Sequence, residues 1–361
     1  MKKLFIGLFA VILLSAVLSA MYLFSTVEKP ETILVNGTNT NPVSYTDSNF
    51  LAKLKSAYPT VYRILDNDEI KAGYVIPGLE QSQAIYHTGQ NKGKLGISKE
   101  MDPQGMAIID DKYIAISAYS RGKIFNSVIW LIDKVSGHYI KTIALDAAYH
   151  VGGITYDEDK HQLWIATVDD EGRAQIKSLK FETIETYNLN TSKQPIVFDY
   201  SDDLGDIRLT SYLTYHNGTI YAGYFDENAK GVLAAYPLNE EGNLIRNSNS
   251  PTVEPSRTWA VPEQIQGISF YKNFILLSQS YGNKPSQLYI YEDDITGSDF
   301  KFDHANIVTK LELPPYLEQI VGDNGDVLLL FESATAKYRQ NPFIFSIDRI
   351  LKIKVDEMND K

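Results

Sequence analysis

The sequence predicts an all-β protein, a five-bladed β-propeller that follows an apolar N-terminal segment. Five segments of the body share one pattern, an apolar strand that begins near a glycine, a tight polar turn, and a second, more apolar strand. The segments recur at spacings of 48 to 60 residues. Repeats of short strands at about 40–50 residues are typical of propeller blades. The 24 tyrosines against 15 phenylalanines also favour β-structure.

Composition sets limits on the function. The chain has 361 residues, of which 44% are hydrophobic and 22% charged, as in ordinary globular proteins. The formal net charge of −11 argues against nucleic acid and anionic lipid as main partners. Cysteine is absent, so the chain has no disulfide, thiolate metal site or catalytic thiol.

The N-terminus carries a membrane signal. Lys2 and Lys3 precede an apolar run of 21 residues from Leu4 to Phe24. A bilayer core needs about 20 helical residues, and the lysines favour a cytoplasmic N-terminus. We therefore expect residues 1–24 to be an uncleaved single-pass anchor in the cell membrane, with the body extracytoplasmic. The alternatives are a cleaved signal peptide on a secreted protein and a buried core helix.

The rest of the chain divides by composition. Residues 25–49 are rich in Thr, Asn, Ser and Pro and are expected to form a flexible spacer. Residues 50–73 form a lead-in with a short helix over Phe50–Tyr58, whose apolar residues have helical spacing. The propeller is expected over residues 74–356, followed by a tail, 357–361.

The repeats can be aligned on a glycine-like position and on the turn that follows it. The aligned positions are Gly105, Gly153, Leu213, Gly267 and Gly322. The turns fall at Asp110-Asp111, Asp157–Lys160, Asn217-Gly218, Lys272-Asn273 and Asn324-Gly325. Asn-Gly is a strong hairpin signal, so each repeat is predicted to open with a β-hairpin.

The number of blades depends on the stretch from Thr60 to His87. It contains one strand-like segment, AGYVIPGL, which can complete the last blade and seal the ring. We favour five blades closed in this way, with a degenerate sixth blade as the alternative. A β-sandwich is disfavoured because the hairpins recur at nearly constant spacing.

The alignment predicts a polar ring at one mouth of the channel. The position three before the aligned residue is always polar, with Asp102, His150, Thr210, Gln264 and Gln319. The position one before it adds Gln104, Tyr212 and Gln266. Residues two apart on a strand share a side. These side chains are therefore expected to bind a small molecule, peptide, glycan or envelope protein, or simply to satisfy backbone groups in a wet channel.

His150 is the candidate for chemistry, because imidazole can act as acid, base or metal ligand. Two consecutive repeats also share a Glu-Gln-Ile tripeptide, which contains Glu263 and Glu318. A divalent cation such as calcium, held by Asp102, His150, Glu263 and Glu318, is the alternative to a site without a cofactor. Common hydrolase, zinc and EF-hand signatures are missing from the sequence.

The segments PQGMAI, IQGISF, HVGGITYD and SQSYG followed by SQLYIY resemble secreted bacterial propellers of the broad lactonase and strictosidine-synthase-like kind. The resemblance covers Tyr74 to Asp356. In the sugar-lactonase branch it implies a channel metal held by Glu, Asn and Asp, whereas the equivalent positions here offer glutamines, His150 and Asp102. Five-bladed glutaminyl cyclases also use such strands, but the acid–Gly–Trp segment is absent.

We therefore expect a membrane-tethered, extracytoplasmic propeller that binds a ligand or partner without catalysis. The alternative is a metal-dependent hydrolase or lactonase, or a glutaminyl-cyclase-like enzyme, that uses the same channel mouth.

Overall fold

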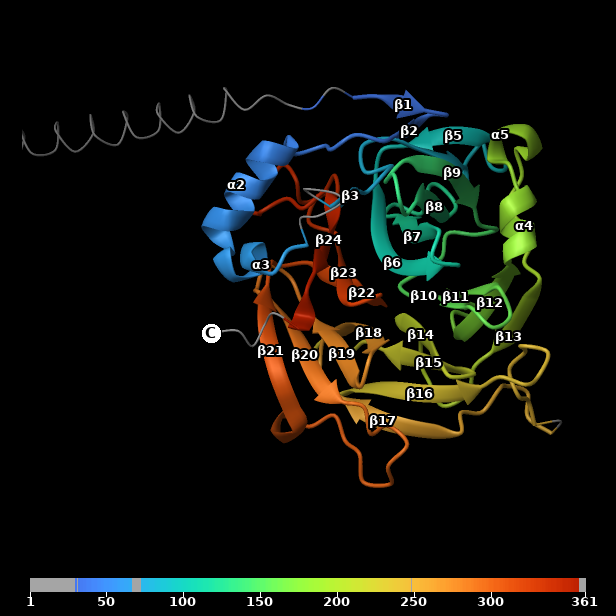
Figure 1. Cartoon of the computed structure of the whole chain (residues 1–361). Helices are drawn as coiled ribbons and strands as arrows, with labels where there is room; N and C mark the ends of the chain where they lie inside the picture. The colour runs from blue at the N-terminus through green and yellow to red at the C-terminus, as the bar shows by residue number, and fades with distance from the viewer. Residues whose placement is uncertain (1–29, 31, 67–72, 248, 357–361) are drawn as a thin grey trace, which may run out of the picture.

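The computed structural model describes residues 30, 32–66, 73–247 and 249–356. In this part of the chain, five antiparallel four-stranded sheets form the blades of a propeller (Figure 1). The innermost strands of the blades contact one another in a closed ring. The prediction of five blades is thus confirmed, and the described residues form no sixth blade.

Each blade is named here by its order along the chain. Blade 1 contains β6 (Met101–Ile109), β7 (Tyr113–Ser120), β8 (Val128–Asp133) and β9 (Tyr139–Ala144). Blade 2 contains β10 (Ile154–Asp157), β11 (Gln162–Val168), β12 (Ala174–Lys180) and β13 (Tyr200–Asp203). Blade 3 contains β14 (Tyr212–His216), β15 (Thr219–Tyr224), β16 (Gly231–Pro237) and β17 (Arg257–Val261). Blade 4 contains β18 (Ile265–Tyr271), β19 (Phe274–Gln279), β20 (Ser286–Glu292) and β21 (Ile307–Leu313).

Blade 5 joins the two ends of the described body. It contains β22 (Leu317–Asp323), β23 (Asp326–Phe331), β24 (Arg349–Ile353) and, as its outer strand, β3 (Tyr74–Val75). Arg349 pairs with Val75, and Ile350 pairs with Tyr74. The N-terminal part of the chain therefore closes the ring, as the segment AGYVIPGL predicted.

Hairpin turns and apolar strand faces explain why these residues form blades. The predicted turns contain residues with positive φ, among them Asn217 (48°), Lys272 (51°) and Asn324 (42°). Apolar residues of neighbouring blades then pack together. Between blades 5 and 1, for example, Leu328 and Ile350 lie in one buried cluster with Met106 and Trp130.

The lead-in contains two helices, α2 (Asp47–Ala57) and α3 (Pro59–Arg63). Phe50 and Leu54 are fully buried in a cluster that includes Leu311 and Ile353 of blades 4 and 5. Arg349, also fully buried, donates hydrogen bonds to Asp47 and to the backbone carbonyl of Tyr45. The lead-in therefore packs against the propeller, beside β21 and β24 (Figure 1).

The expectation of a flexible spacer over residues 25–49 is wrong for the part that the structure describes. Strands β1 (Leu34–Val35) and β2 (Thr38–Asn39) form a small hairpin, and Thr38 and Asn39 are buried. The backbone N–H of Asn39 donates a hydrogen bond to the carbonyl of Gln81, and its carbonyl accepts one from the N–H of Gly78. This segment lies near a second hairpin, β4 (Ser82–Ile85) and β5 (Leu95–Ser98), and near β9 (Figure 1).

Two further short α-helices and one 3₁₀ helix lie in the connections between strands of the described chain. After β12 come α4 (Phe181–Thr186) and α5 (Leu189–Ser192), and before β21 comes the 3₁₀ helix η1 (His304–Asn306). No helix of the described residues is long and apolar enough to cross a membrane. The predicted anchor from Leu4 to Phe24 and the tail at 357–361 lie outside the described residues.

Candidate functional site

The first strands of all five blades begin at the same end of the ring. A cavity of about 800 Å³ lies there, which we call the strand-start cavity. Its walls include Gln104, His150, Gln266 and Glu318, each at or just before the start of an innermost strand. A cavity of this size matches the range found for small-molecule sites.

The pairing of each opening hairpin fixes which residues are structurally equivalent. Gly105 pairs with Ser117 and Gly267 with Ser278, each just after a register shift in the innermost strand. In blade 5 the shift lies between Leu317 and Ile320, which places Gln319 at the equivalent position. The alignment on Gly322 is therefore wrong by three residues, because Gln319 occupies the glycine-like position.

Blade 3 corrects the alignment in the same way. Tyr212 pairs with Gly223 and takes the glycine-like position that the sequence alignment gave to Leu213. A side chain fits there because Gly223 leaves room for the ring, whose Cε2 would lie 1.8 Å from an added Cβ. Tyr212 is fully buried and packs in a hydrophobic cluster. It was predicted as a ligand-binding residue, but it does not line the strand-start cavity.

In the corrected register, the residue just before each glycine-like position belongs to one ring. Its members are Gln104, Gly152, Ser211, Gln266 and Glu318, of which all but the glycine line the strand-start cavity. Gln104 and Gln266 were predicted for this ring, whereas Glu318 was considered only as a metal ligand. In blades 1, 4 and 5 this residue lies at the register shift of the innermost strand.

A second ring comes from the ends of the second strands and escaped the sequence reasoning. Its five members occupy one equivalent position, and all of them line the cavity. They are Tyr119, Val168, Phe225, Ser280 and Glu332. Extending the sequence alignment through the second strand of each repeat would have revealed this ring.

The other predicted residues lie in different places. Asp102 is 1% exposed beside the cavity and forms an ion pair with Arg121, which lines the wall. Gln264 is outside the lining and donates a hydrogen bond to the backbone carbonyl of Glu227. Gln319, 2% exposed, lines a different cavity on the far side of the channel. Thr210 lines the strand-start cavity.

Three carboxyl groups gather near blades 5 and 1. Burial raises the pKa of Asp102 to about 7, although Arg121 opposes this shift. Burial, followed by the charges of Glu332 and Asp102, raises the pKa of Glu318 well above its ordinary value. Burial also raises the pKa of Glu332, whose carboxylate accepts a 3.2 Å hydrogen bond from Gln104. Each of these carboxyls therefore holds its proton to a higher pH than an ordinary carboxyl does.

The Glu318 carboxyl lines the cavity without a partner among the described residues. The side chain is 6% exposed, and no hydrogen bond joins it to another described residue. In its protonated form, a carboxylic acid offers one O–H donor together with acceptor capacity. The protonated carboxyl can therefore donate to a ligand in the cavity that carries a hydrogen-bond acceptor.

His150 contributes a neutral group to the wall. Its ring stacks on Tyr119, with centroids 4.6 Å apart and planes at 27°. The surrounding protein, and then the charges of Lys123 and Arg121, lower the pKa of His150 to about 4. At pH 7 the imidazole is therefore uncharged and can both donate and accept a hydrogen bond.

The alternative metal set is not brought together. Glu263 is exposed and lies outside the strand-start cavity, and Asp102 is already paired with Arg121. In the described part of the chain, no group of three or more His, Asp or Glu side chains is arranged to hold a metal ion.

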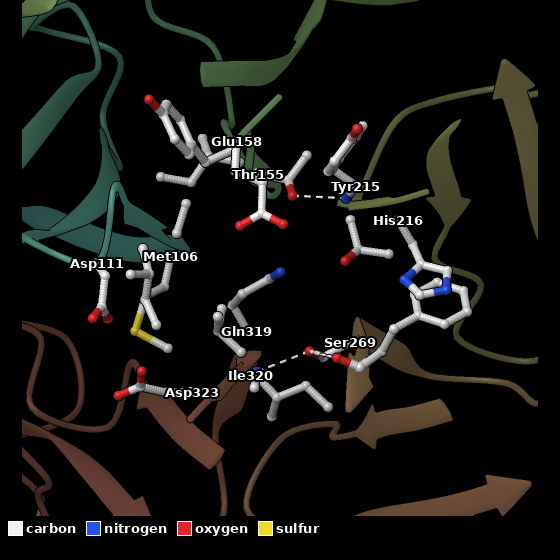
Figure 2. Close-up of a pocket in the computed structure, with 18 of the residues that line it drawn as sticks. Met106, Asp111, Thr155, Glu158, Tyr215, His216, Ser269, Gln319, Ile320 and Asp323 are labelled. Atoms are coloured by element: carbon white, nitrogen blue, oxygen red, sulfur yellow. Dashed lines mark hydrogen bonds between the residues drawn. The ribbon is translucent and has the colours of Figure 1, made fainter. Parts of the chain in front are cut away.

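A second cavity, of about 740 Å³, lies where the opening hairpins turn. We call it the hairpin cavity, and Figure 2 shows it in close-up with Asp111, Glu158, His216, Gln319 and Asp323 around it. The innermost strands all run from the strand-start cavity toward these turns. The two cavities therefore open at opposite ends of the channel and share no lining residue.

Comparison with known proteins adds only distant likenesses. No family model matches the sequence, and no curated protein matches it. An oxidoreductase of Thermus thermophilus, named as a glucose dehydrogenase, shows 11% identity and a TM-score of 0.42 over 79% of this chain and 94% of that one. The β-propeller domain of the Trilobed protease from Pyrococcus furiosus shows 11% identity and a TM-score of 0.33 over 66% of each chain. We draw no functional conclusion from such weak likenesses.

Proposed function

We propose that this protein is a ligand-binding propeller whose binding site is the strand-start cavity. The observation that carries the proposal is the Glu318 carboxyl, which has no partner among the described residues and lines a cavity to which all five blades contribute. The ligand is a small molecule, or the end of a peptide or glycan, that carries acceptor oxygens. Those oxygens would receive hydrogen bonds from Glu318, Gln266 and His150.

The charges on the wall further limit the ligand. Asp102, beside the cavity, is paired with Arg121. Lys123 lines the same cavity and forms no ion pair with another described residue. The site therefore suits a neutral or anionic ligand better than a cation. The tyrosines that line the cavity offer flat surfaces for the apolar part of the ligand.

We also propose that residues 4–24 tether the propeller to the cell membrane with its body extracytoplasmic. The support is the apolar run behind two lysines. Fractionation of cells and the mass of the mature N-terminus test this part. An intact N-terminus in the membrane fraction is expected, and a shortened soluble chain would contradict it.

A hydrolase remains the second candidate because three carboxyls with raised pKa values adjoin the cavity. The raised pKa of Glu318 suits this carboxyl to donate a proton, and Glu332 at the same cavity is the candidate acceptor. Hydrolysis of model esters, lactones and glycosides by the full chain, lost in Glu318→Ala, would favour this candidate over simple binding.

Binding is tested with a fragment library of carboxylates, amides and polyols and the full chain, observed by ligand-detected NMR. We expect binding that Gln266→Trp abolishes, because the larger ring fills the cavity. Lys310→Trp, a substitution on the outer strand β21, is the matched control and should leave binding unchanged. Fragment binding that survives Gln266→Trp would overturn the proposed site.

A further inference from the structure

Seven aromatic side chains of the described residues, six tyrosines and one phenylalanine, line the strand-start cavity. The hairpin cavity, which has a similar volume, has three in its lining. The rings at the strand-start cavity come from several blades, since Tyr119 lies near the end of β7, Phe225 follows β15 and Tyr338 follows β23. Flat apolar surfaces therefore border this cavity at more than one blade, which favours a ligand with apolar faces of its own.

Tyr281 is the most exposed of these seven residues, at 41%. It forms a tilted pair with Phe225, with ring centroids 6.3 Å apart and planes at 36°. Tyr316 and Tyr338 form a second pair in the wall, with centroids 4.3 Å apart. Because removing an apolar ring face from water is favourable, the exposed ring of Tyr281 is suited to stack against a ligand.

Polar side chains near Tyr281 offer hydrogen bonds to the same ligand. Tyr281 follows β19 of blade 4, and Gln266 lies in β18, the strand that pairs with β19. Glu318 occupies the position equivalent to Gln266 in the neighbouring blade 5. Both side chains line the cavity, and no hydrogen bond joins either of them to another described residue. The amide of Gln266 and the carboxyl of Glu318 are therefore available to a ligand.

Hydroxyl groups match these two side chains better than an ionic group does. An amide offers donors and an acceptor, and a carboxyl accepts when ionised and can also donate when protonated. A hydroxyl both donates and accepts, so it can bond to Gln266 and to Glu318 in either protonation state. The lining contains both carboxyls and cations, so a carboxylate or an ammonium ligand would meet like charges.

A pyranose ring combines both requirements, since its C–H groups form apolar faces and its hydroxyls surround the edge. We propose that the strand-start cavity takes a neutral saccharide, whose ring stacks on Tyr281 and whose hydroxyls bond to Gln266 and Glu318. The volume of about 800 Å³ leaves room for a disaccharide. The saccharide site rests on the proposed function, because it is the same cavity.

The test screens the full chain, purified without glycoside detergents, on an array of neutral and acidic oligosaccharides. The affinity for the neutral disaccharide that binds best is then measured by NMR titration. Sorbitol, an acyclic polyol that has hydroxyls but no ring, serves as the reference. We expect the disaccharide to bind about tenfold more tightly than sorbitol, because only a ring can stack on Tyr281.

Tyr281→Ala should weaken disaccharide binding about tenfold, while Tyr281→Phe, which keeps the ring, should bind within about twofold of wild type. Gln266→Leu should weaken binding severalfold, since it removes hydrogen bonds but little volume. Phe343→Ala, at a 95% exposed ring outside the cavity, is the matched control and should have no effect.

Sorbitol binding as tight as that of the disaccharide, or equal weakening by Tyr281→Ala and Phe343→Ala, would overturn the proposal. Binding confined to acidic glycans would overturn it as well.

The Gln266→Trp variant separates this proposal from the proposed function. If fragments bind the wild type and not Gln266→Trp while no saccharide binds, the saccharide is ruled out and the proposed function stands. Saccharide binding that survives Gln266→Trp would place the sugar outside the cavity and overturn the saccharide site. The absence of both fragment and saccharide binding would overturn both proposals.

Discussion

The hydroxyl of Ser278 donates a 2.7 Å hydrogen bond to the backbone carbonyl of Glu318, across the boundary between blades 4 and 5. Ser117 makes a similar contact across the boundary between blades 1 and 2, with the carbonyl of Val151 at 2.8 Å. Both serines pair with a glycine, Gly267 or Gly105. A Cβ on Gly267 would lie 3.1 Å from the Glu318 carbonyl, so the small residue permits the close approach. These contacts hold Glu318, and the segment next to His150, at the strand-start cavity.

Ser278→Ala is expected to destabilise the protein by about 1 to 3 kcal/mol, because it leaves the buried carbonyl of Glu318 without its donor. Denaturant unfolding measures the change. Ser298→Ala, at an exposed serine, should alter the free energy of unfolding by less than about 0.5 kcal/mol. Equal values for the two variants would show that the contact between the blades is unimportant.

Gly73→Ala is expected to disturb closure of the ring. Gly73 has φ +92°, and an added Cβ would lie 2.1 Å from the backbone oxygen of Ile350, in the strand that β3 completes. We expect a loss of roughly 2 kcal/mol or more and faster amide exchange in β24. Gly89→Ala, with φ +78° and no atom within 4 Å, isolates the cost of the backbone angle. If both variants lose the same free energy, the contact with Ile350 has no influence on closure.

The pKa of Asp102 predicts how stability depends on pH. The folded chain holds this proton with a pKa of about 7, against 3.8 for an ordinary aspartate, and Asp102 is 1% exposed. The folded state therefore binds the Asp102 proton more tightly than the unfolded state does. The stability that this proton contributes is lost as pH rises from about 4 to about 7. Between pH 6 and 8 the loss is about 1 kcal/mol.

Asp102→Asn should remove this part of the pH dependence. The measurement is the free energy of unfolding of wild type and variant at pH 6, 7 and 8, and Asp299→Asn is the exposed control. Histidines that titrate in the unfolded chain affect all three proteins equally, so the comparison isolates Asp102. Parallel curves for wild type and Asp102→Asn would contradict the raised pKa.

His150 should titrate near pH 4 in the folded protein, observed by NMR of the imidazole. Lys123→Gln removes one of the two cations that lower its pKa and should raise that pKa, while the surrounding protein still holds it below 6.5. Lys310→Gln, on an outer strand, should leave it unchanged. A midpoint near 6.5 in the wild-type protein would show that His150 is freely solvated.

Much of the fold could be predicted because its signals are local. Turn residues such as Asn217-Gly218 and the glycines at 105 and 267 recur at matching places, and they require the hairpins that form. Blade 5 was aligned incorrectly because its glycine-like position is Gln319, while an unrelated glycine, Gly322, follows three residues later. A β-bulge has no reliable sequence signature, so the register could not be corrected before the pairing was seen.

The candidate site was predicted less completely. Gln104, His150 and Gln266 come together at one cavity, since equivalent positions in a ring of blades meet at one mouth. Arg121 and Glu332 were missed because they follow second strands, where packing between blades was the favoured interpretation. Thr38 and Asn39 were assigned to a flexible spacer on polar composition alone. Their burial depends on contacts with residues more than 40 positions away, such as Gln81.

The most direct test of the proposed function is a crystal structure of the full chain exposed to the same library of carboxylate, amide and polyol fragments. The proposal predicts fragments in the strand-start cavity, with an acceptor oxygen within hydrogen-bond distance of the Glu318 carboxyl and in reach of His150 or Gln266. Fragments bound only elsewhere, with that cavity filled by solvent alone, would contradict it.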